Sequence, residues 1–408
     1  MGKEEMKQYI GQQVEAIRSE LMEISQYIFQ NPEVAHTEHK ACAKQVEYLK
    51  SKGYEVTENP AGVDTAFVAT YRNGEGPHIA VLSEYDCLPN GLDHACGHNL
   101  IAAASMGAGA AMIEAMKKFD IKGTFSVIGT PYEETDGGKI DLLKGGVFDD
   151  VDACMAVHPT TAMSRVAGEC LCSCHYVIEY HGQTAHAWAR PWKGKNAFDA
   201  AIMCFNAVAM MRQQTEDGVR IDYGFVEGYE QTGSVRDYVK LTLGLAAPTP
   251  MIVEDVRKKV EGCIEAGAAA TGCTVEYHGE MGYKNRIPNS VLGDFFRENC
   301  VALGEPMQPG MPADSGGEDL GNVSHVIPAI NPHMTILPER KISNHTVEFR
   351  NIVDSPAGEK FIMLNSKTLA DTVVDLLLSP EAVQKAKEEL QQRLKELYGD
   401  QVEKYVRS

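Results

Sequence analysis

Between residues 10 and 28 the apolar side chains recur at alternating spacings of four and three positions. The members of this stripe are Ile10, Val14, Ile17, Leu21, Ile24 and Ile28. This is the period of an α-helix with one apolar side. We therefore predict one continuous amphipathic helix near the start of the chain.

Short apolar runs and helical patterns then alternate up to about residue 171. Strands are predicted at 67–70, 79–83, 124–129 and 153–157, and helices at 40–51 and 99–118. Strands that are apolar along their whole length, alternating with helices, are typical of a parallel-rich sheet covered by helices on both faces. This part of the chain is predicted to be an α/β domain.

The pattern changes at about Cys172. Strand, helix, two strands, helix and strand follow one another at 175–180, 197–212, 219–226, 238–245, 253–270 and 274–277. The order β-α-β-β-α-β is typical of a ferredoxin-like α+β unit. After it come a strand near 334–336, a helix at 359–378 and a second helix with Pro380 at its first position. The simplest organisation is a discontinuous domain, 1–171 with 287–408, interrupted by an inserted domain at 172–286.

Composition excludes several classes of partner. The formal net charge of −19 lacks the basic footprint of a nucleic-acid-binding protein and disfavours anionic membranes. The N-terminus lacks a signal-peptide pattern, and the longest run of low charge, 100–113, is too short to span a bilayer. Eleven cysteines without framework-like spacing indicate free thiols. We expect a cytoplasmic protein with no nucleic-acid or membrane partner.

Candidate chemistry gathers where predicted strands end. The segment 82–99 carries Cys96 and His98, and the segments 131–134 and 157–159 carry a Glu-Glu pair and His158. Ligands in parallel-rich sheets bind beyond the carboxyl ends of the strands. A thiolate together with an imidazole suits zinc and similar metals. One Cys-x-His pair is weak support, but three such clusters in order indicate a metal site.

A two-metal hydrolytic site needs several ligands and one spare carboxylate as the base. The candidate ligands are Cys96, His98, Glu134, His158 and His345, with Glu133 as the spare carboxylate. If the Glu-Glu pair is extended, its two side chains point in opposite directions, so that one binds metal and the other faces water. A Glu-Glu pair alone is more often a solvated turn. We expect His94 to support the loop, and His36, His39, His78 and His325 to be ordinary surface or packing residues.

Taken together, these motifs resemble the dinuclear metallopeptidases of peptidase family twenty, in the branch that carries His-Ala-Cys-Gly-His. The matching segments are 31–33, 84–89, 94–99, 131–139, 158–159, 182–187, 191–197, 319–324 and 345–349. That branch includes aminobenzoyl-glutamate hydrolase and β-alanyl-lysine dipeptidase. The resemblance implies a homodimeric amidohydrolase acting on a small-molecule amide, with two divalent ions (zinc or manganese, with cobalt possible).

The resemblance also implies roles for individual residues. The five candidate ligands above would hold the metals and Glu133 would be the general base. The inserted domain would be a lid that carries the dimer interface, and its His186 would reach the neighbouring subunit's site. By itself, His186 would be interpreted as a packing histidine. Segment 231–238 departs from the family pattern, which puts the usual grip on the substrate carboxylate in doubt. Arg236, Arg286 and Asn289 are the candidate substrate-binding residues.

Three alternatives remain open from the sequence. A cysteine hydrolase could use Cys96 as nucleophile and His98 as base, although this leaves the other candidate ligands unexplained. The chain could be a non-catalytic binding subunit, because a fold alone does not establish activity. It could also be a metal hydrolase of another C–N bond, such as that of an aryl amine or a cyclic amide.

Overall fold

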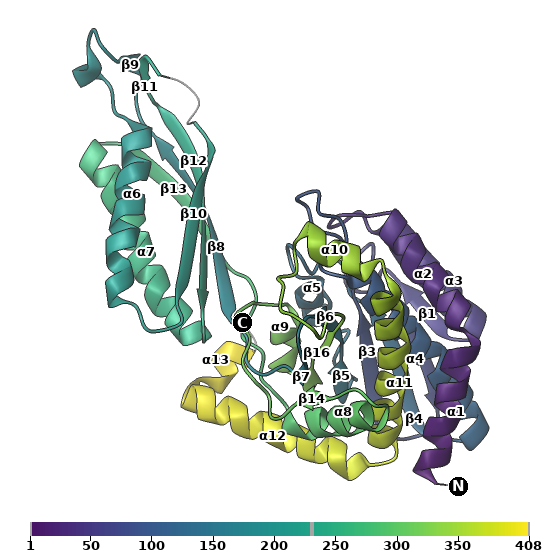
Figure 1. Cartoon of the computed structure of the whole chain (residues 1–408). Coiled ribbons are helices and arrows are strands. Elements are labelled where there is room, and N and C mark those ends of the chain that lie inside the picture. The colour runs from purple at the N-terminus through teal and green to yellow at the C-terminus, as the bar shows by residue number, and fades with distance from the viewer. Residues whose placement is uncertain (1, 229–231, 407–408) are drawn as a thin grey trace. The chain divides into compact units, whose positions relative to one another are not determined.

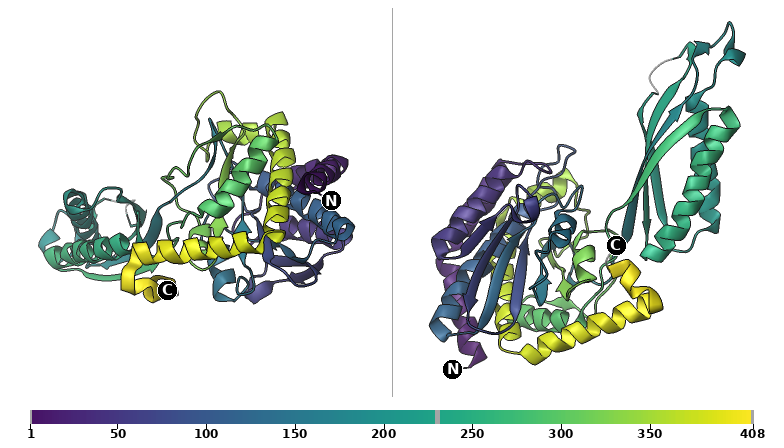
Figure 2. Two further views of the ribbon diagram at one scale, coloured as in Figure 1. Left: turned by 90° about the horizontal axis from the view of Figure 1, so that it is seen from below. Right: turned by 180° about the vertical axis from the view of Figure 1, so that it is seen from behind.

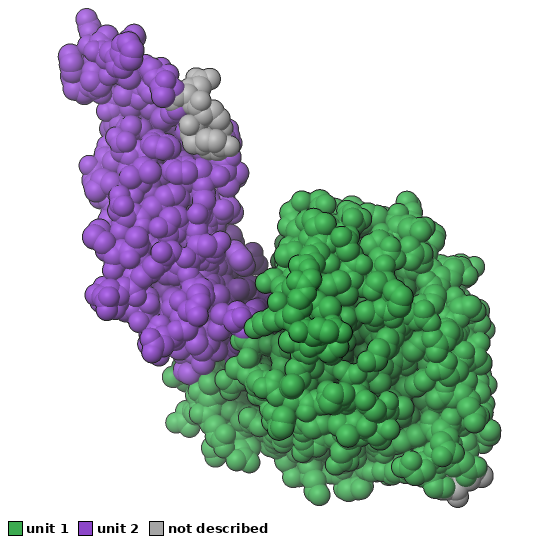
Figure 3. All heavy atoms as spheres, in the orientation of Figure 1, with its two compact units in different colours: residues 1–169, 286–314, 319–408 green, residues 170–285, 315–318 purple. Residues whose placement is uncertain are grey.

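The computed structural model describes residues 2–228 and 232–406, so Gln231 of the divergent segment lies outside the described residues. The chain separates into two compact units (Figure 3). Unit 1 comprises Met1–Glu169, Arg286–Asp314 and Asp319–Ser408, and unit 2 comprises Cys170–Asn285 and Ser315–Glu318. Each unit is described by itself.

A six-stranded sheet forms the centre of unit 1, in the order β1-β2-β4-β3-β5-β15. Its strands are β1 (Glu55–Glu58), β2 (Phe67–Asn73), β3 (His78–Ser83), β4 (Gly123–Gly129), β5 (Ala153–Met155) and β15 (Ala329–Ile330). The pairs β3–β4, β3–β5 and β5–β15 are parallel, whereas β1–β2 and β2–β4 are antiparallel. The predicted α/β class with a parallel-rich sheet is confirmed.

Helices cover both faces of this sheet (Figure 1 and Figure 2). Ile79 and Val81 of β3 point into one apolar core, and Ala80 and Leu82 point into another on the opposite face. The first core is built mainly with α1 (Lys3–Ala16), α2 (Arg18–Gln30), α3 (His39–Lys52), α4 (His98–Phe119), α8 (Ser290–Ala302) and α11 (Pro356–Leu377). The second core uses α5 (Gly138–Lys144) and α9 (Leu320–Ser324).

A second, smaller sheet in unit 1 has the order β14-β7-β16-β6. Its strands are β6 (His158–Thr160), β7 (Ser164–Val166), β14 (Met307–Gln308) and β16 (Pro332–Thr335). Unit 1 is completed by α10 (Val347–Val353), α12 (Pro380–Tyr398) and α13 (Val402–Val406). Strand β16 runs parallel to β6, so segments far apart in the sequence become neighbours next to His158.

The long helix α4 is largely buried within unit 1. By length and composition it could cross a membrane, but 94% of its most apolar stretch is buried inside the protein. The low-charge run 100–113 is the central part of this helix, which extends beyond it at both ends. Small residues allow close packing: a Cβ at Gly107 would lie 2.1 Å from Ser366 Oγ of α11.

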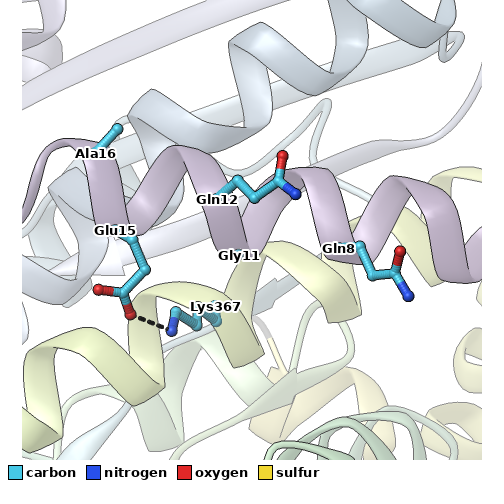
Figure 4. A pocket seen from close by; sticks show the side chains of 6 residues that line it. All are labelled: Gln8, Gly11, Gln12, Glu15, Ala16 and Lys367. Atoms are coloured by element: carbon cyan, nitrogen blue, oxygen red, sulfur yellow. Dashed lines mark hydrogen bonds and ion pairs between the residues drawn. The ribbon is translucent and has the colours of Figure 1, made fainter.

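The N-terminal apolar stripe forms two helices rather than the one predicted. At Ile17 the backbone turns to φ −103° and ψ 11°, although its N–H still bonds Gln13 O and its carbonyl still accepts from Leu21 N. The helical hydrogen bonds therefore continue through a kink. Figure 4 shows α1 beside α11, where Glu15 and Lys367 form a 2.6 Å ion pair at the edge of a surface hollow.

Unit 2 contains a four-stranded antiparallel sheet in the order β10-β12-β8-β13. Its elements are β8 (Cys172–His181), β9 (Ala185–His186), α6 (Ala197–Met211), β10 (Arg220–Glu227), β11 (Ser234–Val235), β12 (Tyr238–Ala247), α7 (Pro250–Thr271) and β13 (Thr274–Met281). Helices α6 and α7 lie side by side on one face of the sheet (Figure 1). Strands β9 and β11 form a separate small pair.

Candidate metal centre

The loop between β3 and α4 brings Cys96 and His98 together. Gly97 caps α4 with φ +83°, a conformation that favours glycine, and a Cβ there would lie 2.6 Å from Pro159 Cγ. Helix α4 starts at His98 itself, so the imidazole is held at a rigid helix end. Both side chains are buried, and Cys96 Sγ lies 3.2 Å from His158 Nε2.

Asp86 orients the imidazole of His98. His98 Nδ1 donates to Asp86 Oδ1 at 2.9 Å, which turns Nε2 toward the carboxylates of Glu84 at 3.6 Å and Glu134 at 3.7 Å. A carboxylate behind a ligating histidine fixes its tautomer and raises its basicity. Burial opposes the imidazolium, but the negative charge of Asp86 outweighs it and raises the pKa of His98 to about 9.

The Glu133–Glu134 pair lies in a turn, so the expectation of an extended backbone was wrong. Tyr132, immediately before it, has φ +44°, and the Glu134 N–H donates to Asp86 Oδ2 at 3.0 Å. The two carboxylates therefore converge instead of pointing apart: Glu133 lies 3.9 Å and Glu134 3.7 Å from His98 Nε2. One carboxylate can ligate while the other stays close to the same centre.

His345 reaches the cluster from a distant part of the sequence. Its N–H donates to Ala95 O at 3.0 Å, and its Nε2 lies 3.4 Å from Glu134 Oε1. Its backbone is left-handed, with φ +60°. Backbone strain of this kind in a non-glycine residue is typical of functional sites.

The donor atoms fit divalent ions. Three sets have ligand atoms within 4.8 Å of one another: Cys96, His98 and His158; Cys96, Glu134 and His345; and His98, Glu133 and Glu134. Within the described chain, His98 Nε2 and Glu134 Oε1 are buried without a hydrogen-bond partner. Buried polar atoms are normally satisfied. Cations between these sets would satisfy both atoms with a mixed sulfur, nitrogen and oxygen donor set.

The carboxylates at this centre differ electrostatically. Burial, followed by the charges of Glu84 and Glu134, raises the pKa of Glu133 well above its usual range. Burial acts in the same direction on Glu134, but its contact with His345 and the charge of His98 outweigh it and lower the pKa. Glu134 is therefore ready to ligate as an anion, and Glu133 is the carboxyl that readily holds a proton.

Comparison with known proteins identifies the family. The model of peptidase family M20/M25/M40 matches residues 80–362. The Xaa-Arg dipeptidase of Mus musculus is 32% identical over 96% of this chain and 93% of its own length. The chain belongs to peptidase family M20. The resemblance drawn from the motifs is confirmed, and the chain is a hydrolase of peptide or other C–N bonds.

Other relatives agree with this assignment. One of the two subunits of the p-aminobenzoyl-glutamate hydrolase of Escherichia coli (strain K12) is 27% identical over 74% of this chain and 66% of its own length. In structure, the Bacillus subtilis YXEP protein, described as a dinuclear metal binding peptidase from the M20 family, matches with a TM-score of 0.66 at 18% identity. That match covers 89% of this chain and 99% of the other.

Behind the centre of this M20 chain lies a buried ion network that the sequence analysis did not single out as functional. Lys139 Nζ donates to Glu84 Oε1 and to Asp319 Oδ1, each at 2.7 Å, and all three side chains are buried. This network places Glu84 near His98 Nε2. The acidic Glu84 and Asp86 directly after a buried strand were the available signal.

The predicted substrate-binding residues lie in different surroundings. Arg286 is buried, donates from Nε to Gly168 O at 2.7 Å and pairs with Asp314 at 3.2 Å. Asn289 caps α8 through Oδ1 and donates from Nδ2 to Ala386 O at 2.8 Å, so its contacts are those of a structural helix cap. Arg236 lies in unit 2, between β11 and β12, and is half-buried.

Two histidines singled out in the sequence lie outside the cluster. His186 is exposed on β9 of unit 2, and its Nδ1 accepts from Trp188 N and Ala189 N at 3.3 Å. His94 is buried, its Nε2 lies 3.1 Å from Ile28 O, and burial lowers its pKa to about 4. A neutral, buried His94 in the loop between β3 and α4 is consistent with the supporting role expected for it.

Proposed function

We propose that this M20 chain is a two-metal amidohydrolase that cleaves an N-acyl or aminoacyl amino acid or a dipeptide-like substrate. The observation that carries the proposal is the convergence of five candidate ligands, in which two buried ligand atoms lack a hydrogen-bond partner within the described chain. The ligands are Cys96, His98, Glu134, His158 and His345. Two divalent ions, zinc or manganese with cobalt as a further option, would supply Lewis acidity to a water nucleophile and to the scissile carbonyl.

In this proposal Glu133 is the general base. It would take the proton from the attacking water and deliver it to the leaving amine. Its position beside His98 supports this role, and so does its raised pKa, which makes it able to hold a proton between the two steps. Divalent cations nearby would lower that pKa again and so favour the carboxylate form that accepts the proton.

The substrate class follows from the named relatives. Xaa-Arg dipeptidase and p-aminobenzoyl-glutamate hydrolase are both named for amide substrates whose leaving group is an amino acid. We infer a substrate of the same kind for this chain. A substrate with a different C–N bond is the competing proposal, because segment 231–238 departs from the family pattern.

The surroundings of Cys96 argue against the cysteine-hydrolase alternative. Burial and the charges of Glu134 and Glu133 raise the pKa of its thiol well above the usual range. A nucleophilic cysteine requires the opposite shift, because the thiolate is the reactive form. The surroundings of Cys96 therefore suit a thiolate that binds a cation better than a thiolate that attacks the substrate.

Unit 2 is proposed to be the ferredoxin-like lid and dimerisation domain. Its β-α-β-β-α-β order and its exposed apolar side chains on α6, Ile202, Met203 and Met210, support this interpretation. In the homodimer, the exposed His186 would donate to the substrate oxyanion of the partner subunit. The eleven cysteines are all free, which supports the proposed location in the reducing cytoplasm.

A substrate panel tests the proposal. Chelator-treated enzyme, reloaded with manganese, zinc or cobalt, is assayed with alanyl-arginine, p-aminobenzoyl-glutamate, an N-acetyl amino acid and a cyclic amide. We expect hydrolysis of at least one of the first three, strictly dependent on added metal. Full activity in metal-free protein would favour the cysteine mechanism, and cleavage of the cyclic amide alone would overturn the substrate class.

Glu133→Gln provides the matched test of mechanism. The variant should retain bound metal, measured by mass spectrometry, while kcat falls by about 10²- to 10⁴-fold, as is typical when a general base is removed. Glu134→Gln is the matched comparison variant, and its content of bound metal should fall. If Glu133→Gln stays active while Glu134→Gln is inactive with its metal retained, the two roles are exchanged.

A further inference from the structure

His333 is placed beside the metal centre by strand pairing. In the parallel pair of β16 and β6, His333 is the register partner of His158, so the two side chains lie on the same face of the small sheet. Their ring centroids are 5.3 Å apart. His333 is therefore a neighbour of a proposed metal ligand, although it is far from that ligand in sequence.

The tautomer of His333 follows from its contact with Arg165. Arg165 Nη2 lies 3.0 Å from His333 Nδ1, and a guanidinium can only donate. Nδ1 must therefore accept, and the proton of the neutral ring sits on Nε2. Within the described chain this Nε2 is buried and has no hydrogen-bond partner. Such a donor is costly to leave unsatisfied, which points to a missing acceptor.

The charge around His333 is positive. Arg165 and Arg286 both pair with Asp314, at 2.7 and 3.2 Å, and Asp314 Oδ2 lies 3.6 Å from His333 Nδ1. Arg286 is fully buried and also held by Gly168 O, whereas the side chain of Arg165 keeps one fifth of its surface exposed. Both guanidinium groups lie close enough to His333 for their positive charge to act on its ring. This environment favours an anionic acceptor.

We propose that His333 binds the carboxylate of the amide substrate through its Nε2–H, with Arg165 fixing the tautomer and supplying the positive charge. The proposal rests on the proposed function, because it names a subsite for the amino-acid part of that substrate. The substrate carboxylate would then be bound within unit 1, without a contribution from the divergent segment 231–238. His333 is thus a specificity-determining residue of the same subunit that holds the proposed metal ligands.

Paired substrates test this subsite. Wild-type protein, His333→Leu and His333→Gln are assayed on the panel acid that wild type cleaves fastest and on its C-terminal amide, which keeps the scissile bond but removes the carboxylate charge. His333→Leu should lose about 10- to 100-fold in kcat/KM on the acid, mainly through KM, and little on the amide. His333→Gln, whose amide nitrogen sits near the position of Nε2, should recover part of the loss.

Two further measurements separate substrate binding from a structural role. Metal content should be unchanged in His333→Leu, and nitrogen NMR of histidine-labelled wild type should show a ring with protonated Nε2 and unprotonated Nδ1 that vanishes in the variant. His325→Gln is the control, since His325 is a buried histidine of the same unit whose nitrogens contact Gly321 O and Tyr398 Oη. It should leave the acid-to-amide preference unchanged.

The outcomes distinguish the two proposals. If wild type hydrolyses none of the panel substrates, the proposed function fails and this subsite fails with it. If wild type cleaves the acid but His333→Leu keeps the full preference for acid over amide, only the subsite is refuted. Equal losses on acid and amide, loss of metal, or an Nδ1-protonated tautomer would also refute it.

Discussion

Asp371 on α11 is a buried carboxyl whose charge the fold does not compensate. Its Oδ1 has no hydrogen-bond partner in the described part of the chain. Burial, only partly offset by the charge of Lys7 and reinforced by Asp375, raises its pKa to about 8. Lys7 is already committed to Asp375 Oδ2 and Asn299 Oδ1, each at 2.6 Å. Replacing Asp371 with Asn should therefore stabilise unit 1.

The size of this effect follows from proton linkage. The folded pKa of Asp371, about 8, lies above the unfolded value of about 3.9, so the folded state binds the extra proton between these limits. Below about pH 4 Asp371 is protonated in both states and does not lower the free energy of unfolding. As the pH rises toward 8 the free energy of unfolding falls, by up to about 5 kcal/mol. Asn resembles the protonated carboxyl, so the gain from Asp371→Asn should be near zero at pH 4 and largest at pH 8.

The assay must report on unit 1. Both tryptophans, Trp188 and Trp192, lie in unit 2, so their fluorescence does not follow the unfolding of α11. Urea unfolding read by hydrogen exchange of α11 peptides, at several pH values from 4 to 8, measures the free energy directly.

Asp375→Asn is the matched control, one turn along the same helix. Asp375 pairs with Lys7 at 2.6 Å and with Lys3 at 3.4 Å. Its loss should destabilise unit 1, by about 1.5 to 3 kcal/mol for a charged hydrogen bond. A difference between Asp371→Asn and wild type that stays flat from pH 4 to pH 8, or that is destabilising at pH 8, would refute the reasoning.

Three further predictions concern the site. Cys96→Ser should reduce metal retention on dialysis, measured by mass spectrometry, because a neutral hydroxyl replaces a thiolate ligand; unchanged retention would exclude Cys96 as a ligand. Gly97→Ala should lose about 1 to 2 kcal/mol from its φ of +83° and more from the 2.6 Å approach to Pro159 Cγ, so a thermal melt that matches wild type would contradict this packing. His186→Ala and Glu133→Gln subunits, each nearly inactive, should recover about half of wild-type activity per heterodimer when refolded together; heterodimers without recovery would remove the role of His186 across the interface.

The sequence by itself determined the architecture of unit 1 and the family. Continuous apolar strands alternating with helices predict the covered, parallel-rich sheet, because side-chain period depends on local backbone geometry. The ordered motifs around Cys96, Glu133, His158 and His345 identify peptidase family M20. These signals are local, or repeat along the chain, and are therefore visible without a structure.

Only the tertiary structure decided how individual side chains are used. The turn at Glu133 and Glu134 depends on contacts with Asp86, so interpreting the pair as extended from its sequence alone missed their convergence. The pairing of β16 with β6 puts His333 beside His158, and the side chain of Asn289 donates to the distant Ala386 O. Each outcome depends on hydrogen bonds between segments distant in sequence. Such contacts form only when the whole chain has packed, so no local pattern encodes them.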